Sequence, residues 1–350
     1  MNGDRHEGSR HTRRRAAWFP LVCLLFLVVW SGSAAADSPA DPLLSGAPPD
    51  VVRAVAGSRL LVADGDTAAA LARLRSWLAR HPADPHPAIL AELGARLADR
   101  DSTAAALAAY REAARLAPDR PELWRAAGAL AYRLGDAREA ADALGRACRL
   151  PGPRDADLWR LTLSAAAQAA DTALVDLAGD SLLARRPGDP ADYRLAAGAW
   201  HAVGRDRRAA ACLELLAAHG TLPVRDRLLL AGLYERLDVP LLAARWYRAA
   251  LADTSAPELV VRLGLALADA GEDSAAIAAW EEGLREYSDG RLHLLLGDRL
   301  LRSGRCAEAR PHLVAAAADP DSAVARPARE LLAWLAGRRR GCQSSPAALY

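Results

Sequence analysis

The sequence predicts an all-α protein built as a solenoid of repeated helical hairpins. From residue 51 onward, apolar residues recur at helical spacing in stretches of about 12–15 residues. These stretches alternate with helix-breaking pairs such as Gly65-Asp66, Pro118-Asp119 and Gly135-Asp136. The pattern repeats about every 34 residues, and no stretch alternates apolar and polar residues for long enough to indicate a sheet. Such a period is typical of units that bury their apolar faces by stacking on their neighbours.

The N-terminal segment 1–36 has the order of a secretory signal peptide. Five Arg precede an uncharged apolar run at 16–30, and small residues follow at 31–36. Ala34 and Ala36 fit the small-residue cleavage pattern, so we expect cleavage after Ala36 and a mature chain from Asp37. The run contains Pro20 and is shorter than the roughly 20 residues of a spanning helix.

We therefore expect an exported protein, either periplasmic or extracellular. The alternative is an uncleaved segment that anchors the chain in the membrane with its repeats facing the periplasm. Residues 37–50, rich in Pro, Ala, Ser and Asp, predict a flexible linker.

Eight repeat units account for residues 51–321, with starts near 51, 87, 121, 156, 190, 224, 257 and 290. Three positions of the unit have a nearly constant size. The eighth is small in seven units, the twentieth is Ala in seven, and the twenty-fourth is large in seven. Small residues let the two helices of a unit approach closely, and we expect the large residue to fill the space between units. The eighth positions are Ser58, Gly94, Gly128, Leu163, Ala197, Ala231, Gly264 and Gly297, and the twenty-fourth are Leu74, Tyr110, Leu144, Gly179, Leu213, Tyr247, Trp280 and Leu313.

These residues resemble the tetratricopeptide repeat (TPR) family, whose unit is a helix–turn–helix of about 34 residues. The third unit carries the resemblance most fully, with Trp124, Ala127-Gly128, Tyr132, Gly135-Asp136, Ala140, Leu144 and Ala147. The resemblance implies a right-handed superhelical solenoid of about eight helix–turn–helix repeats. The fourth unit departs from it most, because Leu163, Val175, Gly179 and Leu182 stand where the pattern has small, small, large and small residues.

The last segments predict a capping helix over 322–340 and a disordered tail over 341–350. The helix resembles the one that covers the last unit of such solenoids. We place Pro327 in its first turn, with Ser322 to Arg326 as a lead-in, because proline is excluded from helix interiors.

No catalytic or cofactor motif is present in the sequence. The chain has 45 Arg and 43 acidic residues and contains no Lys, so it lacks the basic surplus of general nucleic-acid binders and cannot host Schiff-base or P-loop chemistry. The His81–His86 segment is interpreted as a solvated turn and not as a metal site. We expect no enzyme activity, no cofactor and no metal.

The cysteines predict at most one disulfide. Cys306 begins the second helix of the last unit and Cys342 follows the capping helix, so antiparallel packing would bring them together. Cys148 and Cys212, two units apart, should be buried thiols.

The TPR resemblance also implies a concave groove lined by the first helix of each unit. Position five of three successive units would then form a row of arginines, Arg125, Arg160 and Arg194. Further groove residues implied in this way are Tyr132, Arg133 and His201. Guanidinium groups bind carboxylates, so an acidic protein segment is the expected ligand. The alternative is a solvated face on which Glu122 and Asp157 neutralise the arginines.

The expected function is that of a non-catalytic scaffold that binds a protein or peptide in its concave groove. The alternative is an accessory subunit that presents a polysaccharide or lipid substrate to a partner enzyme of the cell envelope. Exposed aromatic residues in the groove would favour that alternative.

Overall fold

The computed structural model describes residues 43–220 and 222–337. Within these ranges all elements of regular secondary structure are α-helices, joined by turns and short loops. The predicted signal peptide, residues 37–42 of the linker, and the tail with Cys342 lie outside the described residues. No helix in the described part is long and apolar enough to cross a membrane. The helices are α1 (Pro49–Ala63), α2 (Thr67–Arg80), α3 (Pro87–Ala98), α4 (Thr103–Leu116), α5 (Pro121–Arg133), α6 (Ala137–Arg149), α7 (Ala156–Gln168), α8 (Thr172–Arg185), α9 (Pro190–Ala202), α10 (Asp206–His219), α11 (Val224–Arg236), α12 (Pro240–Leu251), α13 (Pro257–Asp269), α14 (Asp273–Glu286), α15 (Gly290–Arg302), α16 (Cys306–Ala317) and α17 (Ser322–Gly337).

The same local signals start and stop the helices along the chain. Asp66, Asp136 and Asp171 accept a hydrogen bond from a backbone N–H of the helix that follows, which caps the second helix of their units. Gly135 and Gly271, with φ of 81° and 78°, make the turns between the two helices of the third and seventh units. Glycine suits these turns because a left-handed backbone strains most other residues.

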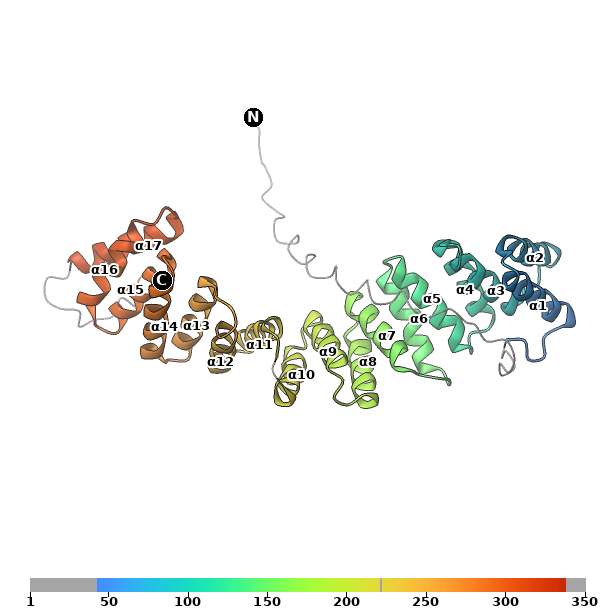
Figure 1. The fold of residues 1–350 in the computed structure, drawn as a ribbon, viewed down its shortest axis with the longest axis horizontal. Helices are drawn as coiled ribbons and strands as arrows, with labels where there is room; N and C mark the ends of the chain where they lie inside the picture. Colours follow the sequence, from blue (N-terminus) through green and yellow to red (C-terminus); the bar gives the residue numbers. More distant parts are fainter. Residues whose placement is uncertain (1–42, 221, 338–350) are drawn as a thin grey trace, which may run out of the picture.

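The helices form a row of hairpins that bends into a superhelical arc (Figure 1). Each odd-numbered helix from α1 to α15 packs against the even-numbered helix that follows it, and each even-numbered helix packs against the next odd-numbered one. First helices of neighbouring units also contact each other where α1 meets α3, α5 meets α7 and α7 meets α9. These first helices therefore lie on the shorter, inner side of the arc, which we call the concave surface. The predicted fold class, an all-α repeat solenoid with a terminal helix, is confirmed.

Close packing inside the units depends on one small and one large residue. A Cβ atom added to Gly128 would lie 2.6 Å from Cγ of Leu144, and one added to Gly94 would lie 2.7 Å from Cδ2 of Tyr110. Gly264 stands against Trp280, and Gly297 against Leu313, in the same way. In these four units the large residue thus occupies the space left by the glycine of its own unit, where we had expected it between units.

The fourth unit reverses this pair. Its large residue is Leu163 on α7, which is completely buried, and its small residue is Gly179 on α8. The space beside Gly179 is taken by Trp200 of the fifth unit, whose Cζ2 would lie 2.7 Å from an added Cβ. The departure seen in the sequence is therefore an exchange of roles that also ties the fourth unit to the fifth.

The last helix, α17, corrects one expectation. It begins at Ser322, so Pro327 lies inside it and residues 322–326 are not a lead-in. Asp321 makes this early start possible: its carboxylate accepts the N–H of Ala323, and its carbonyl accepts the N–H of Ala325. Pro327 has no backbone N–H, so α17 loses only the one hydrogen bond that this group would donate. The helix therefore tolerates the proline.

Candidate binding surface

The arginines at position five of the third, fourth and fifth units form a row of ion pairs between units. Nη1 of Arg125 donates to Asp155 at 2.7 Å, at the start of α7. Nε of Arg160 donates to Asp192 of α9 at 2.6 Å, and Nε of Arg194 donates to Asp226 of α11 at 2.6 Å. Each arginine of this row, which we call the arginine ladder, therefore bonds to an acidic residue of the next unit.

Arg160 is the most enclosed member of the arginine ladder. A second nitrogen donates to Asp192 at 3.0 Å, and a third donates to Asp157 at 2.8 Å. The side chain of Asp192 is only 1 % exposed, whereas that of Asp155, the partner of Arg125, is 49 % exposed. The hydrogen bond to Asp192 raises the pKa of Arg160. Burial acts to raise the pKa of Asp155, but the bonds from Arg125 and from the N–H of Leu158 outweigh it, and that pKa is lowered.

The three guanidinium groups are therefore paired with carboxylates of the chain, while those of Arg125 and Arg194 stay partly exposed. Of the two acidic partners that the sequence suggested, Asp157 takes part, and the ladder otherwise uses Asp155, Asp192 and Asp226. Sequence reasoning missed these partners because they lie 30 to 32 residues away. The available signal was an Asp at position three of both the fifth and the sixth units.

The other predicted groove residues also have partners. Nε2 of Gln168 donates to the phenol oxygen of Tyr132 at 3.0 Å, which links the ends of α5 and α7. Arg133 lies 3.8 Å from Asp101. A ring nitrogen of His201 lies 3.0 Å from Asp206. The binding role expected of Tyr132, Arg133 and His201 stays a prediction.

Small residues occupy position nine of the first helices of units two to six, between the charged side chains of the concave surface. They are Ala95, Ala129, Ser164, Gly198 and Gly232, and we call this row the small-residue floor. Gly198 in α9 and Gly232 in α11 differ from the packed glycines, because an added Cβ would meet no atom within 4 Å at either. Nothing in the described structure fills the space above them.

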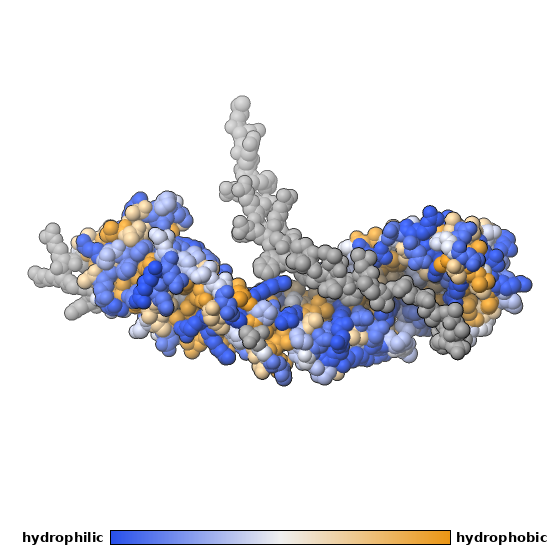
Figure 2. Space-filling view, viewed as in Figure 1, coloured by the Kyte–Doolittle hydropathy of each residue, from blue (hydrophilic) through white to orange (hydrophobic). Residues whose placement is uncertain are grey.

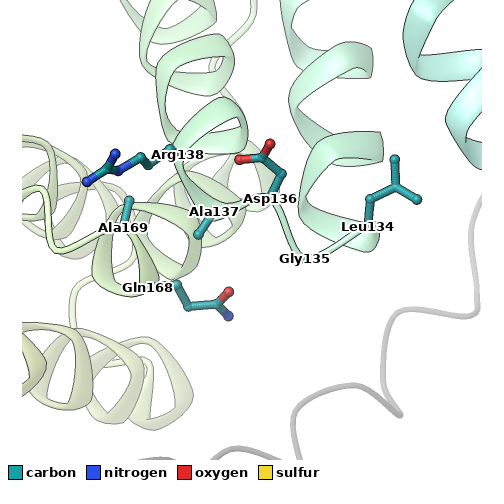
Figure 3. A pocket seen from close by; sticks show the side chains of 7 residues that line it. All are labelled: Leu134, Gly135, Asp136, Ala137, Arg138, Gln168 and Ala169. Atoms are coloured by element: carbon teal, nitrogen blue, oxygen red, sulfur yellow. The ribbon is translucent and has the colours of Figure 1, made fainter. Parts of the chain in front are cut away.

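A hollow of about 580 Å³ lies between the turns of the third and fourth units, lined by residues 134–138 and by Gln168 and Ala169. Figure 3 shows Arg138 and Gln168 pointing away from each other around Ala169. The hollow is open to solvent and carries no cluster of titratable groups. Among the described residues, no three His, Cys, Asp or Glu are placed to hold a metal ion.

The visible surface of the solenoid mixes hydrophilic and hydrophobic residues along its whole length (Figure 2). Exposed leucines occur singly on both kinds of helix: Leu60 and Leu265 lie on first helices, and Leu177, Leu215 and Leu241 lie on second helices. Trp159, Trp200, Trp246 and Trp280 are buried, whereas Trp124, Tyr132 and Tyr193 on first helices are half-buried.

The cysteines are consistent in part with the sequence interpretation. Cys148 and Cys212 are buried free thiols, as expected. Burial raises the pKa of both, for Cys212 to about 11. Cys306 is disulfide-bonded. Because Cys342 lies outside the described residues, the Cys306–Cys342 pairing stays a prediction.

Comparison with known proteins yields structural likeness only. No protein-family model and no curated protein match the chain. A tetratricopeptide repeat protein from Parabacteroides merdae is similar over 71 % of this chain and 98 % of its own, with 16 % identity and a TM-score of 0.40. The C-terminal part of a TPR repeat-containing protein from Cytophaga hutchinsonii is similar over 71 % and 95 %, with 12 % identity and a TM-score of 0.43. PilW, a type IV pilus biogenesis factor, is similar over 59 % and 94 %, with 17 % identity and a TM-score of 0.36.

These identities are low, so the assignment of the fold rests on the chain's own helix pairs. Eight consecutive hairpins stack in one row followed by a seventeenth helix, and in four of them a large side chain of the second helix packs against a glycine of the first. The resemblance predicted from the sequence is confirmed at the level of the fold: this chain is a solenoid of the tetratricopeptide-repeat type.

Proposed function

We propose that the chain is an exported, non-catalytic scaffold that binds a segment of another protein along its concave surface. The observation that carries this proposal is the pair of open glycines, Gly198 and Gly232, in equivalent places of neighbouring units. Glycine inside a helix is less stable than alanine by about 0.5–1 kcal/mol. Neither glycine relieves a contact within the chain, and both leave the helix backbone free for the close approach of a ligand.

The charged side chains of the concave surface support recognition of a polar segment. The arginine ladder and its acidic partners stand beside the small-residue floor, and Arg125 and Arg194 are 40 % and 42 % exposed. A carboxylate of the bound segment could replace Asp155 or Asp226 at these two arginines, because both donors remain within reach of solvent. Such exchange would make binding weaken as the salt concentration rises.

The scaffold is favoured over presentation of a carbohydrate. Sugar rings stack on exposed aromatic faces, whereas Trp159, Trp200, Trp246 and Trp280 are enclosed in the core and the predicted groove residue Tyr132 is half-buried. Export rests on the order of residues 1–36 in the sequence. Mass spectrometry of protein recovered from the cell envelope should find Asp37 as the first residue. Protein that retains Met1 would contradict cleavage and would indicate that the N-terminal segment anchors the chain in the membrane.

Filling the small-residue floor tests the binding proposal. In an affinity capture from envelope extract, Gly198→Phe or Gly232→Phe should remove the captured partner, since each new side chain enters the open space. The matched control is Leu215→Phe on α10, where the leucine is 49 % exposed on a second helix. The variants should keep the helical circular dichroism of the parent. Equal capture by the parent and both floor variants would contradict the proposal.

A further inference from the structure

Two histidines connect the helices of the last hairpin. His293 of α15 and His312 of α16 place their Nδ1 atoms 3.0 Å apart, and their ring centres are 5.3 Å apart with the planes tilted by 33°. The centre separation exceeds the nitrogen separation by about two ring radii, so the two nitrogens point at each other. This is the geometry of one N–H···N hydrogen bond, in which a lone pair of one ring faces the proton of the other.

The hydrogen bond depends on protonation. A neutral imidazole has one donor and one acceptor nitrogen, whereas the charged form has two donors. The contact therefore needs at least one neutral ring. When both His293 and His312 are protonated, two N–H groups and two positive charges face each other across 3.0 Å.

The surroundings of the pair disfavour the charged forms. Burial lowers the pKa of both histidines, and the neighbouring His312 lowers that of His293 further. Two acidic groups oppose this effect in part, Asp289 at the start of α15 on His293 and Glu281 of α14 on His312. From α17, Val324 and Ala328 lie with Ala316 in one apolar cluster, against which Leu294 also packs, and the charged Arg329 donates to the carbonyl oxygen of Ala317 at the end of α16.

Position four of the unit makes the pair unusual. His293 stands where the third, fourth and fifth units have Trp124, Trp159 and Tyr193. A neutral imidazole can pack as these aromatic rings do, and a charged one requires solvation. The last unit thus has a titratable ring at a packing position.

The helices around the pair are weakened in another way. Pro311 lies inside α16, next to His312, and Pro327 lies inside α17. Each proline removes one backbone hydrogen bond from its helix. Among the described residues, α17 packs against α15 and α16 and no later hairpin covers it, so this part of the solenoid is suited to open without the rest.

We propose that the His293–His312 contact is a proton-operated latch: protonation of both rings opens the α15–α16 hairpin and releases α17, while the earlier units stay folded. Opening separates Leu294 from Val324 and Ala328 and so uncovers the apolar end of the solenoid. The stimulus is mild acid, on the acidic side of the ordinary histidine pKa of about 6.5.

Hydrogen exchange with mass spectrometry tests the latch in the full mature chain with its disulfide intact. Exchange is compared at about pH 7.5 and about pH 5, on either side of the ordinary histidine pKa, after correction for the intrinsic rates. Residues 103–185 contain no histidine and serve as the internal reference. Protection of residues 290–337 should fall about tenfold relative to this reference.

Variants separate the latch from general acid sensitivity. His293→Gln with His312→Gln should abolish the acid-induced loss of protection, and the matched control His219→Gln, at an exposed site, should keep it. His312→Arg places a permanent cation against His293 and should lower the protection of residues 290–337 already at about pH 7.5. An undiminished loss in the double variant, no loss in the parent chain, or full protection of His312→Arg at neutral pH would each overturn the proposal.

Discussion

The third and fourth units carry their large and small residues on opposite helices. In the third, Gly128 of α5 makes room for Leu144 of α6. In the fourth, the first helix supplies the large residue, Leu163, and the second supplies Gly179. The third unit is therefore complete within itself, whereas the fourth needs Trp200 from its neighbour to fill the space beside its glycine.

This difference shows that the repeat constrains the side-chain volume at the contact more strongly than the position in the unit that supplies it. A large residue must meet a small one, but either helix can supply it. In the fourth unit the exchange creates a dependence on the fifth unit. Trp200 is held there by a hydrogen bond from its Nε1 to Asp176 of α8 at 3.0 Å, with the guanidinium of Arg208 4.3 Å from the ring centre.

The largest expected effect comes from Trp200→Ala. Removal of this buried side chain should lower the free energy of unfolding by about 3–5 kcal/mol, because it leaves a cavity beside Gly179. Since units of a solenoid interact only with their neighbours, urea unfolding followed by circular dichroism should change from one transition to two.

A second substitution sharpens this prediction. Gly179→Leu should destabilise the parent chain, where Trp200 occupies the space, and should partly restore stability in the Trp200→Ala background. Additive effects of the two changes would show that Gly179 and Trp200 do not share one space.

The arginine ladder provides the next largest contrast between the third and fourth units. Arg160→Ala should lower the free energy of unfolding by about 3 kcal/mol, because it leaves the carboxylate of Asp192 buried without its main partner. Arg125→Ala should lower it by about 0–1 kcal/mol, because Asp155 remains accessible to water. Urea denaturation of both variants measures the difference. Equal losses would contradict the assigned burial, and Arg160→Ala with Asp192→Ala should cost less than Arg160→Ala alone.

Replacing glycine by alanine should lower the stability of the chain at a packed site and raise it at an open site. Gly128→Ala should destabilise by about 1–3 kcal/mol, since its Cβ meets Leu144. Gly198→Ala should stabilise by about 0.5–1 kcal/mol, because alanine favours the helix and the Cβ enters open space. Thermal melting followed by circular dichroism compares the two. A destabilising Gly198→Ala would indicate that the small-residue floor is filled within the chain.

The smallest expected effect is that of mild acid. Burial lowers the pKa of His86, His293 and His312, so the folded chain binds fewer protons than the unfolded chain below neutral pH. Stability should therefore fall as the pH drops through the ordinary value of about 6.5 toward the lowered values. The third and fourth units contain no histidine and should not respond. Urea midpoints at about pH 8 and about pH 5.5 should converge when all three are changed to Gln.

The sequence predicted the fold class because helix period, turn residues and residue sizes all repeat with one spacing. The packing partner of Gly179 could not be predicted in this way, since it comes from the next unit and depends on how the units stack. The partners of Arg160 and Arg194 escaped for the same reason. Pro327 was placed wrongly because the capping role of Asp321 starts α17 five residues before the proline.

Site-specific photo-crosslinking tests the central proposal, ligand binding on the concave surface, most directly. A photoreactive amino acid is placed at Gly198 and Gly232 on the small-residue floor and, as controls, at Leu177 and Leu215 on the second helices, and each chain is irradiated in cells. We predict that both floor positions crosslink to the same partner protein and that the two controls do not. Crosslinks to that partner from Leu177 and Leu215 alone would contradict the proposal.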